Sequence, residues 1–210
     1  MKMMCSICAR AYLSSGFFLA GYTRVILILA AWCAFNSPAF FLPAYVTSII
    51  LDGIDGWIAR RLKQTSNFGA WLDVIIDNMG RSMVWTMLFE WGWLISSLEW
   101  CVFVCNHSAF GVQWKSSFTE SPHWVNAIMA KGFKTPLGVL AIAGLHVLPV
   151  WLYGYQHGIL TSTLHIPEWF QGVGILLLAA GRLLCMCVEI WCIWTHIHYL
   201  TDTEKTKKKN

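Results

Sequence analysis

The chain has 210 residues, of which 57% are hydrophobic and only 12% are charged. Soluble domains carry about 25% charged residues, so this composition excludes an ordinary soluble enzyme and favours a protein that crosses a membrane several times. The net charge of +4 does not indicate nucleic-acid binding, because the basic residues gather in segments between the apolar stretches.

We expect a short N-terminal interfacial segment over residues 1–18, a six-helix transmembrane catalytic domain over 19–200 and a cytosolic basic tail over 201–210. Apolar stretches of about 17 or more residues mark the spans. They lie near residues 19–36, 42–58, 70–92, 95–112, 135–156 and 169–195. Residues 113–133 form the longest polar connection. The predicted fold class is therefore all-α, a polytopic membrane protein.

The basic residues predict the orientation of the spans. The 15 Lys and Arg residues avoid the loops at 36–43 and 156–168. With six spans, the loops rich in basic residues share one side of the membrane with both termini. The positive-inside rule places that side in the cytosol. Lys207 and Lys208, near the end of the chain, resemble a dilysine signal for retrieval to the endoplasmic reticulum, which predicts the endoplasmic reticulum membrane as the location.

Four aspartates interrupt the apolar stretches: Asp52, Asp55, Asp73 and Asp77. The first two are three residues apart and the last two are four apart, so each pair lies on one face of a helix. The short loop between them predicts two antiparallel neighbouring helices. An acid deep in a membrane helix costs about 2.5–3.5 kcal/mol, which argues against an incidental role. Carboxylates are ligands for hard divalent cations, and four of them suit two Mg²⁺ or Mn²⁺ ions that bridge a diphosphate.

The same stretch carries a motif. Residues 52–60 read D-x-x-D-G-x-x-A-R, and after eight further residues 69–77 read G-x-x-x-D-x-x-x-D. This pattern resembles the signature of the class-I CDP-alcohol phosphotransferase family. Its fixed positions correspond to Asp52, Asp55, Gly56, Ala59, Arg60, Gly69, Asp73 and Asp77.

The resemblance implies that family's six-helix membrane fold, with the site open to the cytosolic leaflet. It implies that Asp52, Asp55 and Asp73 hold metal and that Asp77 is a ligand or the general base. Gly56 and Ala59 would leave room for the cytidine nucleotide. Arg60 and Gly69 would line the pocket for the CDP-linked donor.

Neighbouring residues extend the resemblance to one branch of the family, the eukaryotic phosphatidylinositol synthases. Gly21-Tyr22-Thr23-Arg24 is similar to the start of their first helix, and Phe68-Gly69-Ala70 also fits. This implies transfer of a phosphatidyl group from CDP-diacylglycerol to a small polyol acceptor, most favourably myo-inositol, with release of CMP. The basic residues near the site, Arg24, Arg81 and Lys134, are candidates for binding substrate. Arg81 is equally well placed to pair with Asp77.

Two alternatives stay open. One is a phosphotransferase that uses CDP-choline or CDP-ethanolamine. The other is a non-catalytic membrane paralogue with a scaffold or regulatory role, because Asn78 and Lys134-Thr135-Pro136 depart from the inositol enzymes, which carry Arg and Ser-Arg-Pro there. Members of the family often pair through membrane helices, so a homodimer is a further possibility.

Three other acids and one arginine lie in or beside spans. Arg182 and Glu189 are two turns apart on the last span and are expected to form an internal structural pair. Glu90 and Glu99 flank the turn between the third and fourth spans, where an interfacial role is expected.

Overall fold

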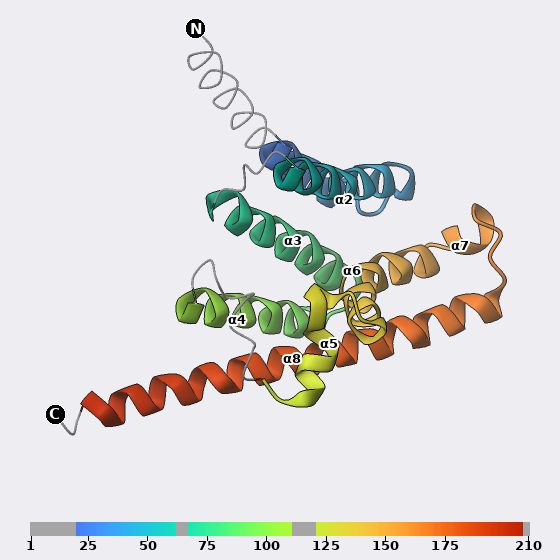
Figure 1. The fold of residues 1–210 in the computed structure, drawn as a ribbon. Coiled ribbons are helices and arrows are strands. Elements are labelled where there is room, and N and C mark those ends of the chain that lie inside the picture. The colour runs from blue at the N-terminus through green and yellow to red at the C-terminus, as the bar shows by residue number, and fades with distance from the viewer. Residues whose placement is uncertain (1–19, 62–66, 111–120, 208–210) are drawn as a thin grey trace, which may run out of the picture. The chain divides into compact units, whose positions relative to one another are not determined.

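A computed structural model of the protein describes residues 20–61, 67–110 and 121–207 (Figure 1). These residues form helices and turns and contain no strand, so the predicted all-α class is confirmed. The first helix is Ala20–Cys33. It is followed by α2 (Pro38–Arg61), α3 (Asn67–Leu88), α4 (Gly92–Phe110), α5 (His123–Phe133), α6 (Pro136–Gln156), α7 (Ile159–Ser162) and α8 (Glu168–Lys207). The predicted interfacial segment 1–18 and residues 208–210 of the tail lie outside the described residues.

Three of the described helices are long and apolar enough to cross a membrane. The stretches are Pro38–Ile58 in α2, Pro136–Gln156 in α6 and Glu168–Thr201 in α8, and Ala20–Cys33 is apolar but shorter. Helices α3 and α4 occupy the places of the third and fourth predicted spans. However, α3 carries Asp73, Asp77 and Arg81, which lower its hydropathy. The count of six spans therefore stays a prediction.

Helix α5 was not expected, because it lies inside the stretch 113–133 that the sequence assigned to a polar connection. Its apolar residues Val125 and Ile128 are three apart and both are buried. They pack with Ala141 of α6 and with Cys185 and Val188 of α8. The helix therefore forms because it completes the core of α6 and α8, even though polar residues flank it in the sequence.

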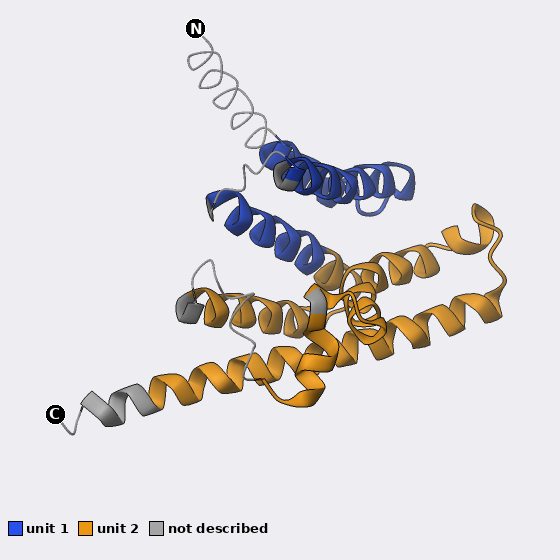
Figure 2. Ribbon diagram, viewed as in Figure 1, with its two compact units in different colours: residues 1–83 blue, residues 84–210 orange. Residues whose placement is uncertain are grey.

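The chain divides into two compact units, residues 1–83 and 84–210, with the boundary inside α3 (Figure 2). In the first unit, glycines let helices approach one another closely. A Cβ atom added to Gly80 of α3 would lie 3.3 Å from Cδ1 of Ile28 and 3.4 Å from Cε2 of Tyr45. Ile28 belongs to the first helix and Tyr45 to α2, so this glycine lies where the two helices meet α3.

In the second unit, α6 packs directly on the backbone of α8. A Cβ atom on Gly144 would overlap the backbone N of Arg182, and one on Gly181 would overlap the carbonyl oxygen of Leu140. Any side chain larger than hydrogen would separate the two helices. Close backbone approach through small residues is a common way for membrane helices to associate.

A buried charged cluster links α4 to α8 in the second unit. Nη1 of Arg182 donates to Oε2 of Glu189 at 2.8 Å, and Nη2 donates to Oε1 of Glu99 at 3.3 Å. The internal pair of Arg182 and Glu189 is thus confirmed. The interfacial role expected of Glu99 is wrong, because Glu99 is buried beside Arg182, whereas Glu90 is exposed in the turn between α3 and α4.

Candidate metal centre and substrate site

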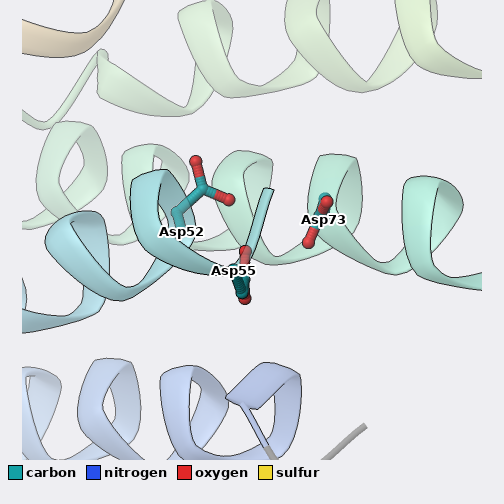
Figure 3. Close-up of side chains that lie close together, drawn as sticks. All are labelled: Asp52, Asp55 and Asp73. Carbon is teal, nitrogen blue, oxygen red and sulfur yellow. The ribbon is translucent and has the colours of Figure 1, made fainter. Parts of the chain in front are cut away.

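Two helices of the first unit supply the predicted aspartates. Asp52 and Asp55 lie one turn apart on α2, and Asp73 and Asp77 lie one turn apart on α3. Figure 3 shows Asp52 and Asp55 close to Asp73 of the neighbouring helix. One carboxylate oxygen from each of these three residues lies within 4.8 Å of the other two. The predicted convergence of the carboxylates from two helices is therefore present.

Arg24 of the first helix joins three of the four aspartates. Its Nη1 lies 2.6 Å from Oδ1 of Asp52 and 3.0 Å from Oδ1 of Asp73. Its Nη2 donates to Oδ1 of Asp77 at 2.7 Å. A planar guanidinium offers several donors in a fixed fork, so it can contact carboxylates from different helices at once. These contacts connect the first helix, α2 and α3 at the four aspartates, hereafter the acidic cluster.

The arginine is buried and its partners are not. The side chain of Arg24 is 2% exposed, whereas those of Asp52, Asp73 and Asp77 are 35%, 43% and 31% exposed. Arg24 therefore approaches the carboxylates from the interior of the unit. The exposed parts of these carboxylates can be reached by a substrate or a cation.

The donor set fits a hard divalent cation. Asp52, Asp55 and Asp73 supply oxygen atoms only, and these lie close enough for cations to contact several of them after small side-chain movements. Such cations prefer oxygen ligands, and Mg²⁺ in particular is commonly held by a few carboxylates together with substrate phosphates. Partly exposed carboxylates leave room for those phosphates.

Apart from Arg81, the remaining predicted site residues fall into three groups. Gly56 of α2 and Gly69 of α3 are half-buried and belong to the same helices as the aspartates. The side chains of Ala59 and Arg60 lie outside the described residues. Lys134 is exposed just after α5, in the second unit.

Arg81 lies four residues after Asp77 on α3 and is buried. Its Nη2 donates to Oδ1 of Asn78, which is buried as well. The sequence left open whether Arg81 binds substrate or pairs with another residue of the protein. This contact favours an internal role, with Asn78 as a partner that the sequence analysis did not predict. The i, i+3 spacing of Asn78 and Arg81 on one helix is the signal that would have suggested it.

Comparison with known proteins gives the family. The model of the family described as CDP-alcohol phosphatidyltransferase matches residues 17–170, which include all four aspartates and Arg24. The chain belongs to this family. The resemblance inferred from the motif is thereby confirmed.

Several members of the CDP-alcohol phosphatidyltransferase family are similar to parts of this chain. A "CDP-diacylglycerol–inositol 3-phosphatidyltransferase 1" of Arabidopsis thaliana is 39% identical over 74 residues, which are 34% of this chain and 32% of that protein. The Saccharomyces cerevisiae "CDP-diacylglycerol–inositol 3-phosphatidyltransferase" is 36% identical over 84 residues, 40% of this chain and 36% of that protein. These matches span about a third of the length of the inositol relatives.

A bacterial relative matches over a longer stretch. The "CDP-diacylglycerol–glycerol-3-phosphate 3-phosphatidyltransferase" of Sodalis glossinidius is 31% identical over 166 residues, 64% of this chain and 91% of that protein. No solved structure matches this chain.

Proposed function

We propose that the protein transfers a phosphatidyl group from CDP-diacylglycerol to an alcohol, with myo-inositol as the acceptor, giving phosphatidylinositol and CMP. The observation that carries the proposal is the convergence of Asp52, Asp55 and Asp73 within 4.8 Å. These three residues lie within the stretch that the family model matches. Relatives that are 39% and 36% identical to parts of this chain bear names specifying this donor and acceptor.

In the proposed reaction, the acceptor hydroxyl attacks the phosphorus distal to cytidine. A new bond forms between the hydroxyl oxygen and phosphorus, and the bond from phosphorus to the bridging oxygen of CMP breaks. Asp77 accepts the hydroxyl proton, because it belongs to the cluster and is partly exposed. Transfer of this kind needs positioning and charge stabilisation, and no covalent enzyme intermediate.

Asp52, Asp55 and Asp73, with Asp77, would hold Mg²⁺ or Mn²⁺, two ions in the proposal. When bound, these ions would neutralise the diphosphate and stabilise the leaving phosphate. Gly56 and Ala59 would leave room for the cytidine. Arg60 and Gly69 would line the donor pocket, and Arg81 and Lys134 remain basic candidates for contact with substrate. The buried side chain of Arg24 contacts the aspartates instead.

A second acceptor has its own support. The long match to the Sodalis glossinidius protein, whose name specifies glycerol 3-phosphate, favours that alcohol as the alternative to myo-inositol. The two acceptors differ in charge, because glycerol 3-phosphate brings a phosphate dianion and myo-inositol is neutral. A site for the first needs basic side chains near the acceptor, and a site for the second does not.

The experiment is an acceptor screen with purified full-length protein. CDP-diacylglycerol and Mn²⁺ are held fixed while myo-inositol, glycerol 3-phosphate and no acceptor are compared, with release of CMP as the measurement. A separate arm offers CDP-choline with diacylglycerol. We expect CMP release with myo-inositol that requires Mn²⁺. Release with glycerol 3-phosphate alone supports the second acceptor, and absence of release in every arm contradicts catalysis.

The proposed setting is the endoplasmic reticulum membrane, with six spans and both termini in the cytosol. A homodimer is the proposed assembly. Glycosylation acceptor sites inserted at residues 36–43 and 156–168 are expected to be modified in microsomes, and sites at either terminus are not. Modification of a terminal site would show that the orientation is the reverse of the proposed one.

A further inference from the structure

Arg24 has an unusual position for a residue expected to bind substrate. It lies on the first helix, and its side chain is almost completely buried. It contacts Asp52 of α2 and Asp73 and Asp77 of α3. Two of those three partners also belong to the set whose oxygens converge as candidate cation ligands. One guanidinium therefore binds the same carboxylates that the metal would use.

The contacts of Arg24 leave a way for a cation to use the same carboxylates. All three contacts use the Oδ1 atom of the aspartate, and each carboxylate has a second oxygen. The side chain of Arg24 is buried, whereas those of its three aspartate partners are 31–43% exposed. A cation that reaches the exposed parts of these carboxylates meets groups already paired with a fixed positive charge.

The charge of the cluster explains why such a residue is needed. Four aspartates carry four negative charges, and Arg24 reduces the sum to three. Like charges on two facing helices repel one another, and the repulsion is strong where water is scarce. Without a cation, α2 and α3 would be driven apart at their acidic faces. A buried arginine with a carboxylate partner on each helix opposes this.

We propose that Arg24 is an internal cation that holds the acidic cluster together when no divalent ion is bound and that weakens the binding of that ion. Arg24 is a positioning residue in this role. The inference rests on the proposed function only in taking the aspartates as metal ligands. It adds that the positive charge of Arg24 lowers the affinity of the aspartates for the metal, because the metal must bind beside that charge or displace it.

The test is direct binding of Mn²⁺ to the full chain in detergent, with no substrate present. Binding is measured from the electron paramagnetic resonance signal of the Mn²⁺ that stays free. Arg24→Gln removes the charge and is expected to bind Mn²⁺ on the order of tenfold more tightly than the wild type, because the carboxylates lose their competing partner. Arg24→Lys keeps the charge but cannot span the carboxylates with one ammonium group. Its affinity is expected to fall between the two.

Arg182→Gln is the matched control. Arg182 is likewise buried and paired with two carboxylates, but those belong to the second unit and not to the acidic cluster. Its removal changes the net charge of the protein by the same amount and is expected to leave Mn²⁺ affinity within about twofold of the wild type. A general effect of net charge or of loosened folding would change both variants alike.

Thermal unfolding gives a second readout. Without metal, Arg24→Gln is expected to unfold at a lower temperature than the wild type. Added Mn²⁺ is expected to raise its unfolding temperature by more than that of the wild type, because a ligand stabilises a folded protein more when it binds that protein more tightly. If Arg24→Gln does not fold, Arg24→Lys decides the question. Affinity equal to or weaker than that of the wild type in the variant that folds overturns the proposal.

The outcome separates from that of the proposed function. CMP release is measured on the same preparations. If the wild type releases no CMP but the order of Mn²⁺ affinities holds, the transfer reaction is rejected and the role of Arg24 stands. If neither the wild type nor Arg24→Gln binds Mn²⁺, the role of Arg24 is rejected whatever the CMP assay shows.

Discussion

Each unit contains a buried arginine paired with carboxylates, but the two clusters differ in whether a ligand can reach the carboxylates. Arg24 and Arg182 are each held by carboxylates from more than one part of the chain. The partners of Arg182, Glu99 and Glu189, are buried with it, so that cluster is closed. The partners of Arg24 are between 31% and 43% exposed, so that cluster can receive a ligand.

The comparison indicates that exposure of the acidic side chains, more than the presence of charge, distinguishes a cluster that can bind a ligand from one that only holds helices together. A buried ion cluster is costly to assemble, and it is strongly destabilised when one partner is removed. An open acidic cluster can exchange one counterion for another. The first kind of cluster fixes helices, and the second is accessible to cations or substrate.

The largest expected effect is on catalysis at the open cluster. Asp77→Asn keeps the shape of the side chain but removes the group proposed to accept the hydroxyl proton. We expect CMP release to fall by about 10²–10⁴-fold, the usual contribution of a general base. The measurement is Mn²⁺-dependent CMP release per mole of folded protein. The control is Glu189→Gln in the closed cluster, which is expected to retain turnover in the fraction that folds.

The proposed catalytic role of Asp77 fails if Asp77→Asn releases CMP at the wild-type rate. A similar loss of turnover in folded Asp77→Asn and Glu189→Gln would instead mean that the two clusters do not differ in the way their exposure indicates.

The next effect is on the stability of the closed cluster. Arg182→Met leaves Glu99 and Glu189 buried without their cation, and we expect a loss of about 3–5 kcal/mol in the free energy of unfolding. Glu99→Gln leaves Arg182 paired with Glu189 in a neutral combination, so its loss is expected to be much smaller. Thermal unfolding in detergent compares the two variants. Equal losses would show that charge balance is not what stabilises this cluster.

The sequence predicts the two clusters unequally, and the reason is the separation of their members. Asp52 and Asp55, or Arg182 and Glu189, share a helix, so spacing alone places them on one face. Arg24 is 49 residues from Asp73 and 53 from Asp77. Glu99 is 83 residues from Arg182. No periodicity connects such residues, so only the packing of the helices reveals their contacts.

Helix α5 and the third and fourth predicted spans show the same limit at the level of elements. Val125 and Ile128 of α5 have helical spacing, but the hydrophobic partners that bury them lie on α6 and α8. The places of α3 and α4 were predictable from their apolar runs. Whether α3 crosses the membrane was not, because Asp73, Asp77 and Arg81 lower its hydropathy.

A smaller effect is expected where helices touch through glycine. Gly144→Ala would place a methyl group against the backbone of Arg182, which cannot move aside, so we expect a loss of about 1–3 kcal/mol from overpacking. In the first unit, Gly80→Ala meets only the side chains of Ile28 and Tyr45, which can adjust. Its loss is expected to be smaller. Thermal unfolding of both variants is the measurement.

Gly172→Ala on α8 serves as the control for these two variants, because nothing lies within 4 Å of its added Cβ. Alanine is the better helix former, so a gain of up to about 1 kcal/mol is expected there. If Gly144→Ala is as harmless as Gly172→Ala, close backbone contact between α6 and α8 does not determine the stability of the second unit.

The smallest effect is expected beside the open cluster, at Asn78. Its side chain accepts a hydrogen bond from Arg81, and both residues are buried. Asn78→Ala removes one of the interactions of Arg81, so we expect a loss of about 1 kcal/mol in stability. If Arg81 serves only to support α3, the KM for CDP-diacylglycerol stays within about twofold, because an internal hydrogen bond makes no contact with the donor. A KM that rises severalfold in Asn78→Ala, and equally in Arg81→Gln, would show that Asn78 orients Arg81 toward the substrate and would move Arg81 from the structural group to the site.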